Sequence, residues 1–137
     1  MVEAVVVLVV AGILTGLAFP RVAPLLDRLA VERAVGGVWS FYQAARFSAL
    51  THGASVRVEL RPDSLVAVYE LTVRDSVFLR RGGPALDGVE LTGTKLTTRL
   101  HANGLGAGAA NLTLTFRRGS YQEKLTLSRL GRMKRWR

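Results

Sequence analysis

The sequence predicts an α+β fold in which one long N-terminal helix packs on an antiparallel β-sheet. Three observations support this prediction. The chain opens with an apolar stretch that ends at Pro20, a segment with three- and four-residue hydrophobic spacing follows, and from residue 54 onward the hydrophobic period becomes two. The length of 137 residues suits one domain preceded by one special segment.

The first segment, residues 4–19, reads AVVVLVVAGILTGLAF and contains no charged side chain. It is slightly shorter than the roughly 20 residues that span a bilayer as a helix. A buried core helix would be polar on one face, yet only Thr15 is polar here. A secretory signal peptide would need a basic region where Glu3 stands and a cleavage site where Phe19 and Pro20 stand.

Glu3 directly precedes this uncharged stretch. A charge placed in bilayer hydrocarbon costs roughly 2.5–3.5 kcal/mol, so such a residue usually has a function. A plain membrane anchor gives no role to an acid at its outer end. One simple interpretation places Glu3 at a membrane surface, where the N-terminal end of the helix dipole favours a negative charge.

Residues 21–52 are predicted to continue the helix with one apolar face. Eight side chains recur at helical spacing: Leu26, Leu29, Ala30, Ala34, Val38, Phe41, Ala45 and Leu50. Gly53 is a suitable residue to end the helix. Pro20 and Pro24 are expected to bend the helix without ending it. The whole helix would be roughly 75 Å long.

After the helix, the alternating pattern predicts short strands separated by turn-like residues. The expected strands are 54–60, 64–73, 76–80, 89–91, 96–100, 111–117, 120–128 and 132–136. Residues 103–110, NGLGAGAA, are expected to form the most flexible loop.

Positive charge is concentrated at the C-terminal end. Residues 117–137 contain eight Lys/Arg and one Asp/Glu, whereas residues 1–116 contain eleven and nine. Such a cluster indicates a polyanion, either nucleic acid or an anionic membrane surface, although a solvated basic tail or a charge-protected edge strand would look the same. The candidate DNA-binding residues are Arg129, Arg132, Lys134, Arg135, Trp136 and Arg137, with Trp136 available for base stacking.

If residues 132–136 form a strand, alternate side chains point to opposite faces. Arg132, Lys134 and Trp136 would then share one face, and Met133, Arg135 and Arg137 the other.

Catalytic patterns are missing from the sequence. The two histidines, His52 and His101, lie far apart without nearby metal-ligand companions, and no cysteine is present. No G-x-S-x-G occurs, and the G-x-G-x-G at residues 104–108 is neither a P-loop nor a dinucleotide fingerprint. We therefore expect a protein that is not an enzyme and that uses no cofactor.

The N-terminal residues resemble the start of type IV pilins and pseudopilins. In that family a basic leader ends in Gly, and a hydrophobic residue and a Glu precede an apolar run that ends at Pro. Here Val2 and Glu3 match that pair, and Pro20 falls at the family's spacing. The leader and the first aromatic residue are absent, so we expect the true start codon to lie upstream, with processing by a prepilin peptidase and N-terminal methylation.

A second resemblance, to the GspH/FimT family of minor pilins and pseudopilins, covers most of the rest of the chain; residues 73–98 match only in being strand-rich. QAARFSALTHG followed by SVRVEL is similar to that family's helix end and first strand. The Asn103-Gly104 loop and the segment SRLGR at 128–132 are similar to its C-terminal pattern. The resemblance implies a hydrophobic transmembrane and filament-core segment at 1–20 and a periplasmic pilin-like domain at 21–137.

The two resemblances together imply a subunit of an envelope-spanning filament, anchored by a single pass in the inner membrane. Glu3 would pair with the α-amine of a neighbouring subunit, and Pro20 would belong to the same assembly segment. Two systems stay open: a type II secretion pseudopilus, and a type IV pilus for DNA uptake, in which Gly131, Arg132 and Lys134 would match a G-R-x-R motif. An unrelated membrane-anchored β domain is the interpretation outside the family.

Overall fold

A computed structural model describes residues 2–71, 74–108 and 111–137, with the backbone but not the side chains of residues 17–21. One helix, α1 (Val2–His52), precedes eight strands, which confirms the predicted α+β fold and the predicted extent of the helix. Gly53 follows the helix at φ 59°, a left-handed conformation that glycine adopts without steric cost, as expected of a residue that ends a helix. Part of the predicted strand 64–73 and part of the predicted loop 103–110 lie outside the described residues.

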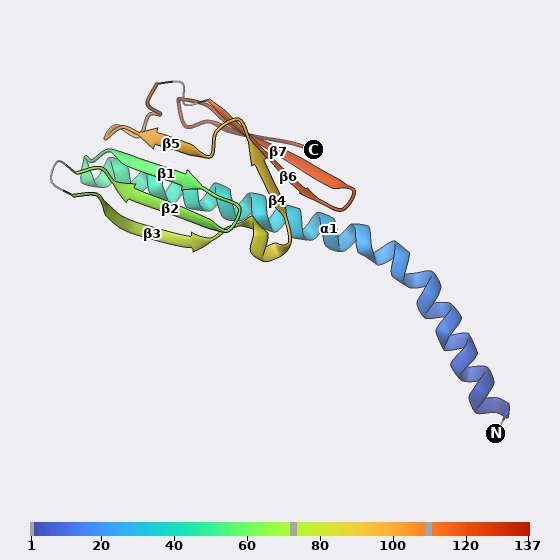
Figure 1. Cartoon of the computed structure of the whole chain (residues 1–137). Helices are drawn as coiled ribbons and strands as arrows, with labels where there is room; N and C mark the ends of the chain where they lie inside the picture. Colours follow the sequence, from blue (N-terminus) through green and yellow to red (C-terminus); the bar gives the residue numbers. More distant parts are fainter. Residues whose placement is uncertain (1, 72–73, 109–110) are drawn as a thin grey trace.

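The strands form two antiparallel four-stranded sheets, where the sequence predicted one (Figure 1). The first sheet has the order β3-β2-β1-β5, and the second has the order β4-β6-β7-β8. The first contains β1 (Val56–Leu60), β2 (Ser64–Tyr69), β3 (Ser76–Gly82) and β5 (Thr97–Leu100). The second contains β4 (Glu90–Gly93), β6 (Leu112–Arg118), β7 (Tyr121–Leu127) and β8 (Met133–Trp136). A short 3-10 helix, η1 (Pro84–Asp87), which the sequence did not predict, connects β3 and β4.

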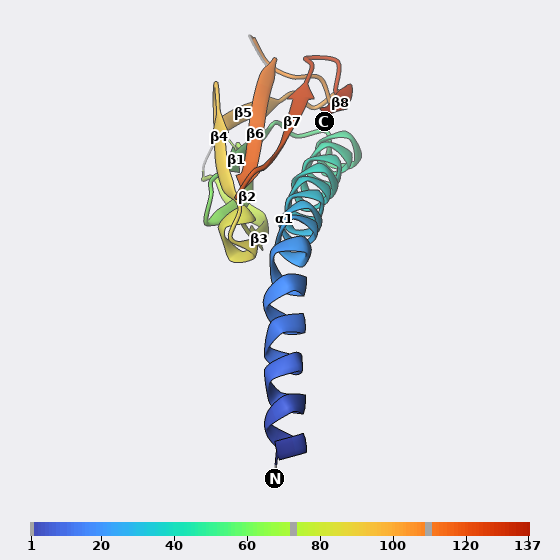
Figure 2. The same cartoon turned by 90° about the vertical axis from the view of Figure 1, so that its right-hand side faces the viewer.

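The second part of α1 packs against both sheets and supplies one side of the core (Figures 1 and 2). The buried helix residues are Ala30, Val31, Ala34, Val35, Val38, Phe41, Tyr42, Ala45 and Ala49. Alternate residues of β1, β6 and β7 complete the core, as the two-residue period requires. Four small alanines on the helix let the strands approach closely, and the larger side chains between them fill the remaining space.

The predicted apolar face of the helix is wrong at three positions. Leu26, Leu29 and Leu50 are each about half exposed, whereas Val31, Val35 and Tyr42 are buried in their place. Leu26 and Leu29 precede Ala30, where the core begins, so helical spacing there says nothing about burial. Leu50 lies just after Ala49, the last buried residue of the helix. In the blue part of the ribbon the helix bends and extends away from the sheets (Figure 1).

Arg46 connects the helix to two separate loops. Its Nε donates a hydrogen bond to the Gly104 carbonyl at 3.0 Å, and its Nη2 donates one to the Leu130 carbonyl at 3.4 Å. Gly131, at φ 78°, has no room for a Cβ, which would lie 2.5 Å from the Arg46 guanidinium. The arginine, the Asn103-Gly104 loop and the SRLGR segment, which are far apart in sequence, therefore form one contact.

We expect Arg46→Met to lower the free energy of unfolding by about 1–3 kcal/mol, because two hydrogen bonds from a charged donor are lost while the aliphatic stem is kept. Urea denaturation followed by circular dichroism measures this change. Arg61→Met is the control. The Arg61 side chain is 62% exposed, and its one ion pair among the described residues, with Glu59, is a surface pair worth about 0–1 kcal/mol. Equal losses from the two variants would refute the connecting role of Arg46.

Candidate functional site

The first turns of α1 form an apolar surface that no other described element covers (Figures 1 and 2). Nine large apolar side chains are 49–78% exposed: Val2, Val5, Val6, Val7, Leu8, Val9, Val10, Ile13 and Leu14. A helix that is apolar on all sides is normally buried in protein or lipid. Over the part of the chain that the structure describes, no helix is long and apolar enough to cross a membrane.

Glu3 lies in the first turn of this helix and is exposed. It forms no ion pair with any other residue within 2–71, 74–108 and 111–137. The helix dipole favours a carboxylate at this end, but only weakly. A charge therefore stands at the start of an uncovered apolar surface. The side chain of Pro20, the other predicted assembly residue, lies outside the described side chains.

The basic C-terminal end forms a strand, as predicted; this strand, β8, pairs antiparallel with β7. Its side chains divide between two faces. The Lys134 ammonium lies 3.6 Å from the centre of the Trp136 ring, so these two side chains share a face. Arg135 points the other way, toward Glu123 of β7 (Figure 2 shows β8 beside α1 and β7).

Arg135 and Glu123 form the most buried ion pair in the described part of the chain. Arg135 Nε and Nη2 donate to the two carboxylate oxygens of Glu123 at 2.5 and 3.0 Å, and Glu123 is only 1% exposed. These hydrogen bonds raise the pKa of the Arg135 guanidinium above its usual value. A bidentate arginine is the partner that a buried carboxylate requires. Arg135 therefore serves the fold through its Nε and Nη2 groups.

Arg137 also has a partner inside the protein. Its Nη2 lies 3.5 Å from Glu32 Oε1 on α1, an oxygen that also accepts a 3.0 Å hydrogen bond from Arg28 Nε. The Arg28 hydrogen bond is the main reason why the pKa of the Glu32 carboxyl is lowered. Nearby, Arg118 Nε lies 3.1 Å from Asp27. These pairs attach the second sheet to the helix.

The other predicted DNA-binding residues are free of ion pairs with described residues. Arg129, Arg132 and Lys134 have exposed side chains, and Trp136 is 49% exposed. The strand register also places Lys124 opposite Trp136. A groove of about 560 Å³ is lined by Gln122, Lys124, Thr126, Trp136 and Arg137.

Sequence reasoning missed Lys124 as a member of this surface. The signal was present, because an alternating hairpin with Leu125 and Leu127 inward must direct Lys124 outward. The pairing of β7 with β8, which brings Lys124 beside Trp136, could not be deduced from spacing alone. Among the described residues, no group of three or more acidic or histidine side chains is placed so that it could hold a metal ion.

The fold is similar to that of a known type IV minor pilin. A crystal structure of FimU from Pseudomonas aeruginosa matches with a TM-score of 0.66 at 14% sequence identity, covering 78% of this chain and 88% of the FimU chain in that crystal. A second crystal form gives a TM-score of 0.62 at 14% identity, covering 77% and 92%. No protein-family model matches the chain, and no curated protein sequence matches it. The chain therefore has a pilin-like fold.

We expect Arg135→Met to lower the free energy of unfolding by about 3 kcal/mol, because it leaves the Glu123 carboxylate buried without a partner. This loss of stability is at the low end of the range for breaking a buried ion pair, because the Arg135 side chain is 35% exposed. The double variant Arg135→Met/Glu123→Leu should recover most of this loss in urea denaturation. A double variant less stable than Arg135→Met would contradict this explanation.

Proposed function

We propose that the chain is a minor pilin or pseudopilin, a subunit of a pilus or pseudopilus. One observation carries the proposal: a single helix has its second part in the core of a pilin-like domain and its first part uncovered and apolar on every side. Exposed apolar surface of this extent requires a partner, because its burial is worth about 25 cal/mol per Å². Helices of other subunits in a filament, and lipid before assembly, meet that requirement.

In this proposal residues 1–20 form the assembly segment and residues 21–137 the periplasmic domain. The subunit is held in the inner membrane by a single pass before assembly, and its leader is removed by a prepilin peptidase. Glu3 pairs with the α-amine of a neighbouring subunit and thereby sets the axial register. A buried carboxylate without such a partner would oppose assembly, whereas a paired one favours a single register.

Replacing Glu3 tests the register role. In cells that assemble the filament, we expect Glu3→Ala and Glu3→Gln to leave the membrane content of the protein unchanged. Both should lower the amount in sheared filaments by at least about tenfold. The neighbour's α-amine would be buried without a partner, and an unpaired buried charge costs about 3–5 kcal/mol. Glu90→Ala, which removes an exposed acid on β4, is the matched control. Normal incorporation of both Glu3 variants, measured by quantitative immunoblotting, would refute the pairing.

A second candidate function is DNA capture for uptake. The observation that favours it is that Arg129, Arg132 and Lys134 have no acidic partner among the described residues. Lys134 also lies against the half-exposed Trp136 ring, and the strand register places Lys124 opposite Trp136. Cations in such a group can neutralise phosphates, and an aromatic ring can stack on bases. A secretion pseudopilin would need none of these contacts, so DNA affinity distinguishes the two systems.

We expect the full chain in detergent to bind duplex DNA weakly, with an affinity that falls with salt at a log–log slope of about −0.9 per phosphate neutralised. Arg132→Ala/Lys134→Ala should flatten this slope by about two contacts. The control pair, Arg80→Ala/Arg81→Ala on β3, should have less effect. No binding at about 50 mM salt in a fluorescence polarisation titration, or equal effects of the two pairs, would favour the secretion system.

A further inference from the structure

The outward face of the second sheet is basic beside strand β8. Alternate residues of β7 point into the core, so the residues between them point outward. The register adds side chains of β8 to the same face, because Trp136 lies opposite Lys124 and Lys134 lies opposite Thr126. The outward side chains of the two strands are Gln122, Lys124, Thr126, Lys134 and Trp136. They include two lysines and no acid.

Carboxylates are scarce on this side of the sheet. Strands β6, β7 and β8 contain a single acid, Glu123, which is buried and accepts hydrogen bonds from Arg135. The acid of β4, Glu90, lies at the opposite edge of the sheet. Neither Lys124 nor Lys134 forms an ion pair with a described residue. The face beside β8 therefore attracts polyanions.

A groove in this face lies against the Trp136 ring. Its volume of about 560 Å³ falls within the roughly 300–1,000 Å³ of small-ligand pockets. The Lys134 ammonium lies 3.6 Å from the centre of the ring but does not line the groove, so part of the half-exposed ring is free of it. Gln122 and Thr126 line the groove with groups that donate and accept hydrogen bonds, and Lys124 adds a cation.

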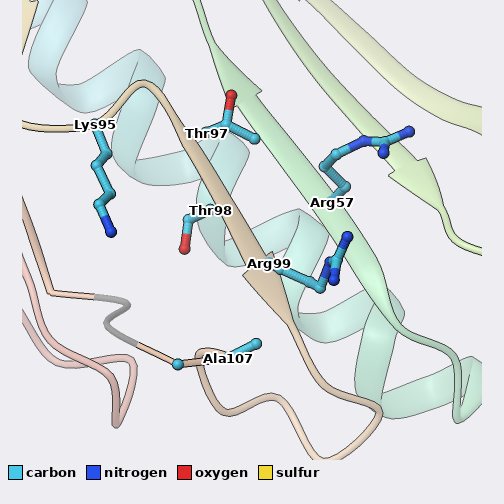
Figure 3. A pocket seen from close by; sticks show the side chains of 7 residues that line it. Arg57, Lys95, Thr97, Thr98, Arg99 and Ala107 are labelled. Carbon is cyan, nitrogen blue, oxygen red and sulfur yellow. The ribbon is translucent and has the colours of Figure 1, made fainter.

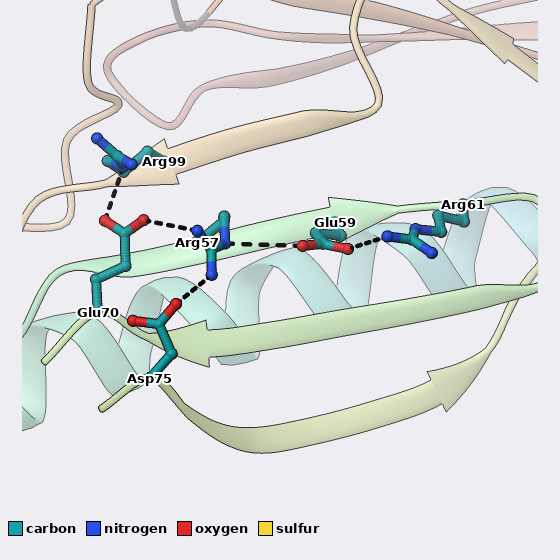
Figure 4. Close-up of polar contacts among 6 residues, drawn as sticks. All are labelled: Arg57, Glu59, Arg61, Glu70, Asp75 and Arg99. Atoms are coloured by element: carbon teal, nitrogen blue, oxygen red, sulfur yellow. Dashed lines mark hydrogen bonds and ion pairs between the residues drawn. The ribbon is translucent and has the colours of Figure 1, made fainter. Parts of the chain in front are cut away.

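The hollow of the first sheet differs, because its arginines are already neutralised. It has a volume of about 400 Å³ and is lined in part by Arg57 and Arg99 (Figure 3). Figure 4 shows the Arg57 guanidinium beside three carboxylates, those of Glu59, Glu70 and Asp75. Arg99 Nε lies 2.7 Å from Glu70. None of the described residues that line this hollow is aromatic, so the combination of unpaired cations and a ring belongs to the groove beside β8.

We propose that the outward face of β7 and β8 binds single-stranded DNA. An unpaired base stacks on Trp136, and the phosphates on either side of it lie beside Lys124 and Lys134. In a duplex both faces of every base are stacked on neighbouring pairs, so a duplex could use the lysines but not the ring. An acidic peptide could likewise use only the lysines. This inference rests on the DNA-capture candidate above and adds the form of DNA that is captured.

The test is a fluorescence polarisation titration of the full chain in detergent at about 50 mM salt. We expect a labelled oligothymidine of about twelve nucleotides to bind at least about tenfold more tightly than a duplex of the same length. Trp136→Ala should remove about tenfold of the single-strand affinity and leave duplex binding unchanged, while Trp136→Phe should retain most of it. Lys124→Ala should weaken both complexes, whereas Lys95→Ala, the removal of an exposed lysine on the first sheet, is the control and should weaken neither.

Two further probes identify the ligand. An abasic oligonucleotide with the same number of phosphates should bind no better than the duplex, and polyglutamate of equal charge should not displace the oligothymidine. Equal affinity for single strand and duplex, or for the abasic probe, would overturn base stacking while DNA capture by cations would stand. Displacement by polyglutamate would identify an acidic protein segment as the ligand instead. Absence of binding to either form of DNA would overturn this inference and the DNA-capture candidate together, without affecting the filament proposal.

Discussion

The packing of the second part of α1 against both sheets is the contact on which the rest of the structure depends. The two sheets share no strand, and each contributes buried side chains to the same helix face. Loss of this contact would expose Phe41 of α1, Phe116 of β6 and the buried leucines of β6 and β7. The helix must be long enough to serve both sheets, and its continuous backbone then carries the apolar first part away from them.

Polar contacts complete this arrangement. Arg46 attaches two loops to the end of the helix, and Glu32 and Asp27 attach the second sheet nearer its middle. The Glu123–Arg135 pair fixes β8 at the sheet edge and leaves no unpaired charge on the buried Glu123 carboxylate. As a result, the basic C-terminal segment is only partly available to a ligand, since the fold itself uses two of its cations.

The helix was predictable because its signals are local. The apolar stretch and the amphipathic one meet at Pro20 and Pro24, which were expected to bend the helix without ending it, and helical spacing continues to His52. Strand positions were also largely predictable from alternation, with ends shifted by a few residues. The division into two sheets was not predictable, because β1 pairs with β5 and β4 pairs with β6, and these pairs join segments far apart in the chain.

The same distinction applies to the candidate site. The exposed position of Lys134 and Trp136 follows from two-residue alternation, as expected from the sequence. The partners of Arg135 and Arg137 could not be predicted in this way. They depend on the register of β7 against β8 and on which face of α1 is turned toward the second sheet.

The most direct test of the central claim is the stability of the chain without residues 1–24. The core begins at Ala30 and the Asp27–Arg118 pair is retained, so the account predicts a soluble monomer that unfolds cooperatively in urea. Its transition midpoint should match that of the full chain in mild detergent. A truncated chain that is unfolded by circular dichroism, or whose midpoint is far lower, would show that the first part of the helix stabilises the domain and would contradict the division of α1 into a packed and an uncovered part.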